Sequence, residues 1–201
     1  DQLCARFDAD RFVTLLAPGA PAPEEILSRL GEWFKSCDCR FELSAHMGVY
    51  PVTDRSVEVS IMCDRAALAV QSVKGSFTNR VGWYDEALRA AILEEQTLTS
   101  EMEGALAQKQ FVLYFQPQIN YATGALSGAE VLVRWRHPQR GLIPPAKFIP
   151  LFERNGFITR LDEYVWEESC RYLRRWMDEG RRDVPVSLSV NISRTDVFRV
   201  T

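Results

Sequence analysis

Three stretches in the second half of the chain alternate between apolar and polar residues. They read FVLYFQP (111–117), AEVLVRW (129–135) and VPVSLSVNIS (184–193). A period of two, with many β-branched and aromatic residues, is typical of β-strands that bury one face. We therefore predict three strands in this half of the chain.

The middle strand carries charge on its polar face. Its apolar face consists of four side chains: Ala129, Val131, Val133 and Trp135. The opposite face carries Leu132 together with a carboxylate and two guanidiniums, which belong to Glu130, Arg134 and Arg136. Glu130 and Arg134 lie about 13 Å apart along an extended strand. Because charges without partners are costly to bury, this face looks at solvent or at a site that uses an acid and a base together.

The two flanking strands add polar groups of a related kind. Gln116 ends the first strand, and the third presents Asn191 among serines on one face. In a parallel α/β barrel the carboxyl ends of the strands carry the chemistry. Glu and Asn offer oxygen ligands to a hard cation such as Mg²⁺, Arg matches a phosphate, and Gln can read a base or sugar edge. On spacing alone, solvated faces of edge strands are the alternative.

The segment between the second and third strands has apolar residues at helical spacing. This spacing predicts helices over 144–156 and 158–180, and a strand–helix–strand order that suits a parallel βαβ unit. We expect the second helix to bury one apolar stripe, formed by Trp166, Cys170, Leu173 and Met177.

The first half alternates strand and helix patterns, which indicates an α+β or α/β unit. Strands are predicted at 11–16, 40–52 and 80–85, and helices at 23–36 and 61–75. From 86 to 110 the chain is dense in helix formers. This long helix is predicted to be a connector, with an amphipathic core helix as the alternative.

Composition narrows the class of protein. Of 201 residues, 46% are hydrophobic and 25% charged, and the net charge of −3 argues against binding a DNA or RNA polymer. No stretch is apolar enough for a membrane span. Five scattered cysteines and two histidines do not form a disulfide framework or a zinc site. We expect a cytoplasmic protein, or the cytoplasmic part of a membrane-anchored sensor, and a fragment of a longer chain.

Residues 105–198 resemble the N-terminal part of EAL domains, the metal-dependent phosphodiesterases of the bacterial messenger cyclic di-GMP. The resemblance is carried by LYFQPQINYATGALSGAEVLVRWRHPQRGLIPPAKFIPLFERNGFI and, after a helix, by SLSVNIS. It implies the first part of a TIM-like (β/α) barrel. It also implies that Glu130 and Asn191 bind Mg²⁺ or Mn²⁺, that Arg134 holds a phosphate of cyclic di-GMP, and that Gln116 and Leu132 line the dinucleotide site.

Two departures from the EAL pattern bear on activity. The signature Glu-Ala-Leu reads Glu130-Val131-Leu132, a variant that also occurs in non-hydrolysing EAL-type receptors. Alternation turns Val131 away from Glu130, so the change alone should leave metal binding intact. The family's later acidic ligands and its catalytic Lys correspond to positions beyond Thr201, so this chain by itself is not expected to hydrolyse the messenger.

Residues 1–85 resemble the latter part of GGDEF domains, the diguanylate cyclases that often precede EAL domains. The resemblance is carried by ARFDADRFVTLL, ELSAHMGVYPV and CDRAALAVQSVKGSFTNRVGWYD, the last of which keeps Lys74, Asn79 and Arg80. The signature positions hold Asp8, Ala9, Asp10, Arg11 and Phe12. Side chains replace the two glycines that let the backbone approach nucleotide, and Arg11 replaces a carboxylate. The resemblance therefore implies a degenerate, non-cyclising domain in which Lys74 is a candidate contact to GTP.

The residues and the two resemblances together predict three parts. These are the C-terminal part of a degenerate GGDEF domain (1–85), a linker helix (86–108) and the N-terminal part of an EAL barrel (109–201). The leading interpretation is a cyclic di-GMP phosphodiesterase that yields linear pGpG in its intact form. One alternative is a receptor that binds the messenger without cleavage, and another is a purely structural interaction module. A homodimer is expected, and a protein effector is a candidate partner.

Overall fold

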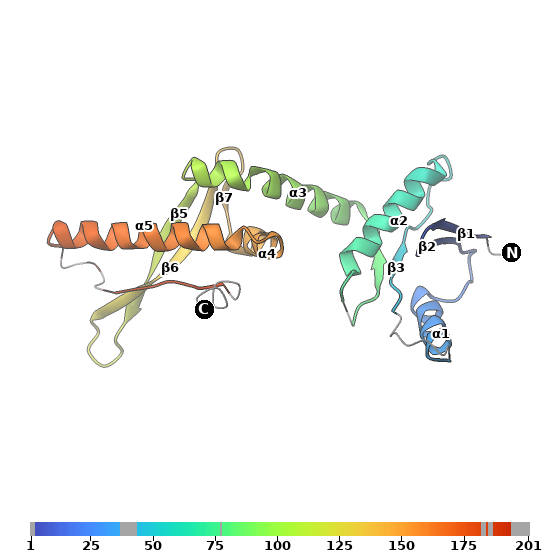
Figure 1. Ribbon diagram of the computed structural model, residues 1–201, viewed down its shortest axis with the longest axis horizontal. Helices are drawn as coiled ribbons and strands as arrows, with labels where there is room; N and C mark the ends of the chain where they lie inside the picture. The colour runs from blue at the N-terminus through green and yellow to red at the C-terminus, as the bar shows by residue number, and fades with distance from the viewer. Residues whose placement is uncertain (1–2, 37–43, 77, 182–183, 185–186, 194–201) are drawn as a thin grey trace. The chain divides into compact units, whose positions relative to one another are not determined.

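The computed structural model describes residues 3–36, 44–76, 78–181, 184 and 187–193 (Figure 1). The chain divides into two compact units, Asp1–Leu93 and Glu94–Thr201. The helix α3 (Glu86–Ala107) begins in the first unit and ends in the second. It matches the predicted long helix within three residues.

Within its described residues, the first unit contains two small sheets, two whole helices and the start of α3. β1 (Leu3–Asp8) and β2 (Arg11–Leu15) form an antiparallel hairpin, and α1 (Pro23–Ser36) follows. β3 (Met47–Val49) pairs in parallel with β4 (Val81–Trp83), and α2 (Val59–Val73) connects them. The predicted strands and helices are confirmed here. The strand predicted at 40–52 is reduced to β3, and its residues 40–43 lie outside the described part. β1 is an additional strand.

Two glycines let α2 lie directly on the β3–β4 pair. A Cβ atom at Gly48 would stand 2.0 Å from the backbone oxygen of Ala66, and one at Gly82 would stand 2.0 Å from that of Ala69. Both distances are far inside van der Waals contact, so any larger residue would push the helix off the strands. Ala69 is completely buried at this contact.

Arg65 of α2 contacts two tyrosines and the first residue of α3. The guanidinium of Arg65 lies over the rings of Tyr50 and Tyr84, at 5.2 and 5.4 Å from their centroids. It donates a hydrogen bond of 2.7 Å to the Tyr50 hydroxyl, and this bond raises the pKa of Arg65. Glu86, the first residue of α3, lies 3.8 Å from the same guanidinium.

The second unit is built on a four-stranded sheet. β5 (Phe111–Ile119) and β6 (Leu126–His137) form a long antiparallel hairpin, and β7 (Gly141–Ile143) adds antiparallel to the end of β6. After α4 (Pro145–Asn155) and α5 (Ile158–Asp178), β8 (Leu188–Ser189) returns parallel to β6. The predicted parallel βαβ unit is therefore confirmed for β6 and β8. β5 runs antiparallel to β6 and so lies outside this parallel pair.

The core of this unit lies on the face of β6 that alternation predicted. Val131 and Trp135 are 3% and 0% exposed, and they pack with Phe111 of β5 against α4 and α5. β7 adds Ile143, and the rest of the buried cluster comes from the helices and the residue before α5: Leu98, Ala105, Phe148, Leu151, Phe152, Phe157, Ile158, Leu161 and Val165. Leu98 and Ala105 belong to α3, so the second half of α3 is an amphipathic helix of this core.

Four polar contacts accompany the docking of α3 on the second unit. Lys147 and Arg154 reach Glu94 and Glu95 at 2.8 and 2.9 Å, and Arg160 pairs with Glu103. These three pairs are exposed, and each therefore stabilises the helix only slightly. The fourth contact is buried on one side, because His137 Nε2 lies 2.9 Å from a carboxylate oxygen of Glu101 while His137 is 5% exposed.

The predicted buried stripe of α5 is wrong. Met177 is 68% exposed and Cys170 is also exposed. α5 instead turns Leu161 and Val165 toward the sheet, and near its end the rings of Tyr172 and Trp176 pack edge-on against Phe115. Both stripes have helical spacing. The stripe that packs on the sheet is the one with Tyr172 and Trp176, because their rings contact Phe115 of β5.

The cysteines of the described part are free. They are Cys4, Cys63 and Cys170, while Cys37 and Cys39 lie outside the described residues.

Candidate functional site

The polar faces of β5 and β6 form one continuous surface opposite the core. In the β5–β6 register Gln116 stands across from Glu130, and Tyr114 stands across from Leu132. Directly paired residues of an antiparallel ladder point to the same side of the sheet. The side chains of Gln116, Glu130 and Leu132 therefore share a face, as the sequence predicted, and Tyr114 joins them.

Asn191 meets Glu130 on this face. Its side-chain Nδ2 donates a hydrogen bond of 3.1 Å to Glu130 Oε1, between residues 61 positions apart in the chain. β8 reaches β6 closely because Gly128 has no side chain, and a Cβ atom there would stand 2.8 Å from Ser187 Oγ. Leu188 and Val190 turn toward the core, so Ser189 and Asn191 turn to the polar face.

Arg134 lies further along β6 and stacks on an aromatic ring. Its Cζ atom is 5.8 Å from the centroid of Tyr114, within the usual range of a cation–π contact. Tyr114 is diagonal to Arg134 across the ladder, because Val112 is the residue directly opposite. Arg134 also donates to the backbone oxygen of Val133 at 2.9 Å. These contacts hold the guanidinium along the polar face.

The donor set suits a hard divalent cation. Glu130 and Asn191 offer a carboxylate and an amide, and turning the Asn191 amide over would direct its oxygen at an ion held by Glu130. Within the described residues, no three His, Cys, Asp or Glu side chains gather as a metal cluster. Mg²⁺ is commonly held by only one or two protein ligands, with water and substrate phosphates completing its shell. The pair therefore fits such an ion as part of its coordination.

Residues 8–12, where the sequence resembles the GGDEF signature, lie at the turn of the β1–β2 hairpin, and Asp8 pairs with Arg11 there. Arg11 Nη2 lies 2.6 Å from Asp8 Oδ2, and the Ala9 backbone N–H donates to Asp8 Oδ1 at 2.7 Å. The hydrogen bond from Arg11 holds the pKa of Asp8 below its usual value. Arg11 thus pairs with the carboxylate at the first signature position, while Phe12 is exposed on β2 and Asp10 lies in the turn. Lys74 is the exposed C-cap of α2.

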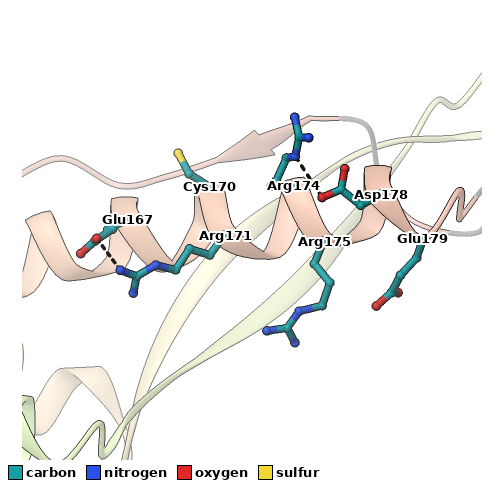
Figure 2. Close-up of a pocket in the computed structure, with 7 residues that line it drawn as sticks. All are labelled: Glu167, Cys170, Arg171, Arg174, Arg175, Asp178 and Glu179. Atoms are coloured by element: carbon teal, nitrogen blue, oxygen red, sulfur yellow. Dashed lines mark hydrogen bonds and ion pairs between the residues drawn. The ribbon is translucent and has the colours of Figure 1, made fainter.

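A shallow hollow lies along α5. It measures about 640 Å³, and its lining comes entirely from one helix end: Glu167, Cys170, Arg171, Arg174, Arg175, Asp178 and Glu179. Figure 2 shows that two of its arginines are already paired, Arg171 with Glu167 and Arg174 with Asp178. This depression holds none of the predicted site residues.

Sequence reasoning missed several residues that adjoin the site. Tyr114 had a usable signal, because alternation places it on the face of Gln116. Asp162 and Trp166 of α5 contact the backbone near Asn191, at 3.1 Å to the Ser193 nitrogen and 3.5 Å to the Asn191 oxygen. They had no local signal, because each contact spans at least 25 residues.

The fold and the site together define a class of protein: an α/β unit that packs helices on one face of a sheet and assembles polar groups on the other. The family model of the EAL domain matches residues 99–200, about half of the chain. The chain belongs to the EAL domain family.

Relatives extend the match along almost the whole chain. The bifunctional diguanylate cyclase/cyclic di-GMP phosphodiesterase MucR of Pseudomonas aeruginosa is 32% identical over 196 residues, which cover 94% of this chain and 28% of MucR. The cyclic di-GMP phosphodiesterase NbdA of the same organism is 33% identical over 190 residues, 92% of this chain and 24% of NbdA. The chain thus spans about a quarter of the length of these relatives.

Among solved structures, the MucR phosphodiesterase in complex with cyclic di-GMP is 41% identical over 48% of this chain and 38% of that chain, with a TM-score of 0.44. No helix in the described ranges combines the length and the apolar character that crossing a membrane requires.

Proposed function

We propose that the protein acts in cyclic di-GMP signalling, and that the polar face of β5, β6 and β8 binds cyclic di-GMP and, in the intact EAL domain, cleaves it to linear pGpG. The observation that carries the proposal is the contact between Asn191 and Glu130, at 3.1 Å. Two oxygen-bearing side chains from separate strands converge at one point, and Arg134 stands on the same face. The names of the relatives MucR and NbdA support the same ligand.

Each residue of the face has a role in this proposal. Glu130 and Asn191 hold a divalent cation, Mg²⁺ or Mn²⁺, through their side-chain oxygens. Arg134, kept in place by Tyr114, presents its fork of N–H donors to a phosphate of the dinucleotide. Gln116 can donate to and accept from a base or ribose edge beside Glu130. Leu132 offers apolar contact between the cation and phosphate positions.

Metal supplies one part of the chemistry: when bound, a divalent ion lowers the pKa of a water for attack on the phosphodiester and neutralises charge on the phosphate. The residues of this chain bind and orient the substrate. Arg134 fixes the phosphate, and the separation of about 13 Å between Glu130 and Arg134 suits a ligand that spans both positions. Val131 lies in the core at 3% exposed, so its side chain does not enter the face.

For the first half we propose a degenerate GGDEF domain without cyclase activity. The ion pair between Asp8 and Arg11 supports this, because the turn at the signature uses its own charges internally. Arg11 stands where the family has a carboxylate, so position 11 offers no oxygen ligand to a cation on a triphosphate. Lys74 would be the remaining contact if this half binds GTP.

Calorimetric titration of cyclic di-GMP into the longest natural form of the protein tests the proposal, with Ca²⁺ replacing Mg²⁺ to suppress cleavage. Arg134→Ala removes a charge-assisted contact and should weaken binding roughly 10- to 100-fold. Arg136→Ala, the same change one pleat further along β6, is the matched control and should bind like the parent. Absence of binding in the parent protein would overturn the proposal. A Mg²⁺ assay for pGpG then separates a phosphodiesterase from a receptor.

A further inference from the structure

Asn191 lies beyond the paired part of its strand. β8 ends at Ser189, which pairs with Glu130, and Asn191 follows two residues later. Its backbone is therefore outside the β6–β8 ladder, although its side chain must reach back to Glu130. The path of the chain after Ser189 decides whether the two site residues meet.

Two side chains of α5 contact this path, one at Asn191 itself and one at Ser193. Trp166 Nε1 donates to the backbone oxygen of Asn191 at 3.5 Å, and Asp162 Oδ2 accepts from the backbone nitrogen of Ser193 at 3.1 Å. Residues 162 and 166 are one helical turn apart and so lie on the same side of α5.

α5 is well anchored at this point. Leu161 and Val165, the neighbours of the two contacting residues, are 0% and 7% exposed in the core. The helix that reaches the Asn191 segment is thus fixed by the same cluster that fixes β6. A short polar contact from such a rigid element limits the positions that the segment can adopt.

We infer that Asp162 is the positioning residue for Asn191, with Trp166 as a weaker support. By holding the backbone at Ser193, Asp162 keeps the Asn191 side chain beside Glu130, and it thereby sets the affinity of the pair for a divalent cation. This inference rests on the proposed function, since it concerns the same cation position. Loss of a group that orients a metal ligand typically lowers metal affinity about 10- to 100-fold.

The test measures Mn²⁺ binding alone, by the electron paramagnetic resonance signal of free Mn²⁺ during titration of the longest natural form of the protein. Asp162→Ala should weaken Mn²⁺ binding about 10-fold or more. Asp162→Asn keeps an oxygen that can accept from Ser193 and should recover most of the affinity. Glu163→Ala, an exposed neighbour on α5, is the control and should leave the affinity unchanged.

A further variant separates positioning from charge. Asp162→Glu keeps the carboxylate and displaces it by one methylene, so a positioning role predicts a several-fold loss of Mn²⁺ affinity. If Asp162→Glu binds like the parent, the carboxylate acts only through its charge and the inference is overturned. The inference is equally overturned if Asp162→Asn is as weak as Asp162→Ala. Asp162→Glu also serves if Asp162→Ala does not fold, which circular dichroism would reveal.

The outcome for Glu130→Gln distinguishes failure of this inference from failure of the proposed function. If Glu130→Gln binds Mn²⁺ as tightly as the parent, Glu130 is not a metal ligand and the proposed site fails. If Glu130→Gln loses binding while Asp162→Ala keeps it within twofold, the site stands and the role of Asp162 is refuted. Loss in both, with recovery in Asp162→Asn, supports both.

Discussion

His137 joins the turn after β6 to α3, and its replacement gives a sharp test of how α3 is held. Its Nδ1 accepts hydrogen bonds from the backbone N–H groups of Gln139 and Arg140, at 3.1 and 3.2 Å. Because a backbone N–H can only donate, Nδ1 carries no proton. The proton is therefore on Nε2, which donates to Glu101 at 2.9 Å.

The cost of His137→Ala follows from these contacts. Each of the two turn hydrogen bonds contributes ~1 kcal/mol. The bond to the carboxylate of Glu101, whose side chain is 37% exposed, contributes about 1.5 kcal/mol after allowance for solvent. Burial of the imidazole against Trp135, 5.7 Å away between ring centroids, adds ~1 kcal/mol. We expect the free energy of unfolding to fall by roughly 4.5 kcal/mol.

Matched variants divide this loss between the turn and α3. His137→Asn places an amide oxygen near the position of Nδ1, so it should keep the turn and lose about 2.5 kcal/mol, from the Glu101 bond and the ring contact. Glu101→Ala in the His137→Asn background should cost little more, because the contact is already gone. Urea unfolding followed by tryptophan fluorescence provides the measurement. The reasoning is refuted if His137→Asn is as unstable as His137→Ala, or if the Glu101 and His137 changes are additive.

Three further predictions concern other parts of the molecule. Gly82→Ala should destabilise the first unit by roughly 3 kcal/mol in urea unfolding, because the new Cβ would stand 2.0 Å from the backbone oxygen of Ala69. An unchanged urea midpoint would show that α2 does not lie on β4 as described. Tyr114→Leu should weaken calorimetric binding of cyclic di-GMP about 3- to 10-fold by releasing Arg134, while Tyr114→Phe keeps the ring and the affinity; equal losses in both would assign the effect to the hydroxyl instead. Burial raises the pKa of Tyr164, so its neutral form stabilises the fold fully below the ordinary value of about 10 and this contribution is lost as the pH rises through the folded-state pKa. The urea midpoint should therefore fall less steeply above about pH 10 in Tyr164→Phe than in the parent, and identical slopes would contradict this.

The strands that carry the site were predictable because their pattern is local. Alternation along β6 separates Val131 and Trp135, which are buried, from Glu130 and Arg134 on the other face. A strand has only two faces, so a period of two leaves one choice. The convergence of Asn191 on Glu130 needed the resemblance to a family as well, because 61 residues separate them.

Features that depend on tertiary packing could not be predicted from the sequence. α5 has two stripes with helical spacing, and only contact with Phe115 decides that the stripe with Trp176 meets the sheet rather than the one with Met177. The direction of β5 depends on whether a hairpin or a crossover joins it to β6, which its own alternation does not encode. The role of Asp162 rests on a backbone nitrogen 31 residues away.

The division of α3 between the two units decides where the gene of a chimaeric protein can be joined. A joint after the helix, near residue 108, would replace Leu98 and Ala105 with residues from another protein. The core of the second unit would then lose the α3 side chains that pack in it. A joint before Glu94 keeps the second half of α3 together with the sheet and with the charged residues that pair with it. Chimaeric genes built at the earlier position should therefore survive selection more often than those built at the later one.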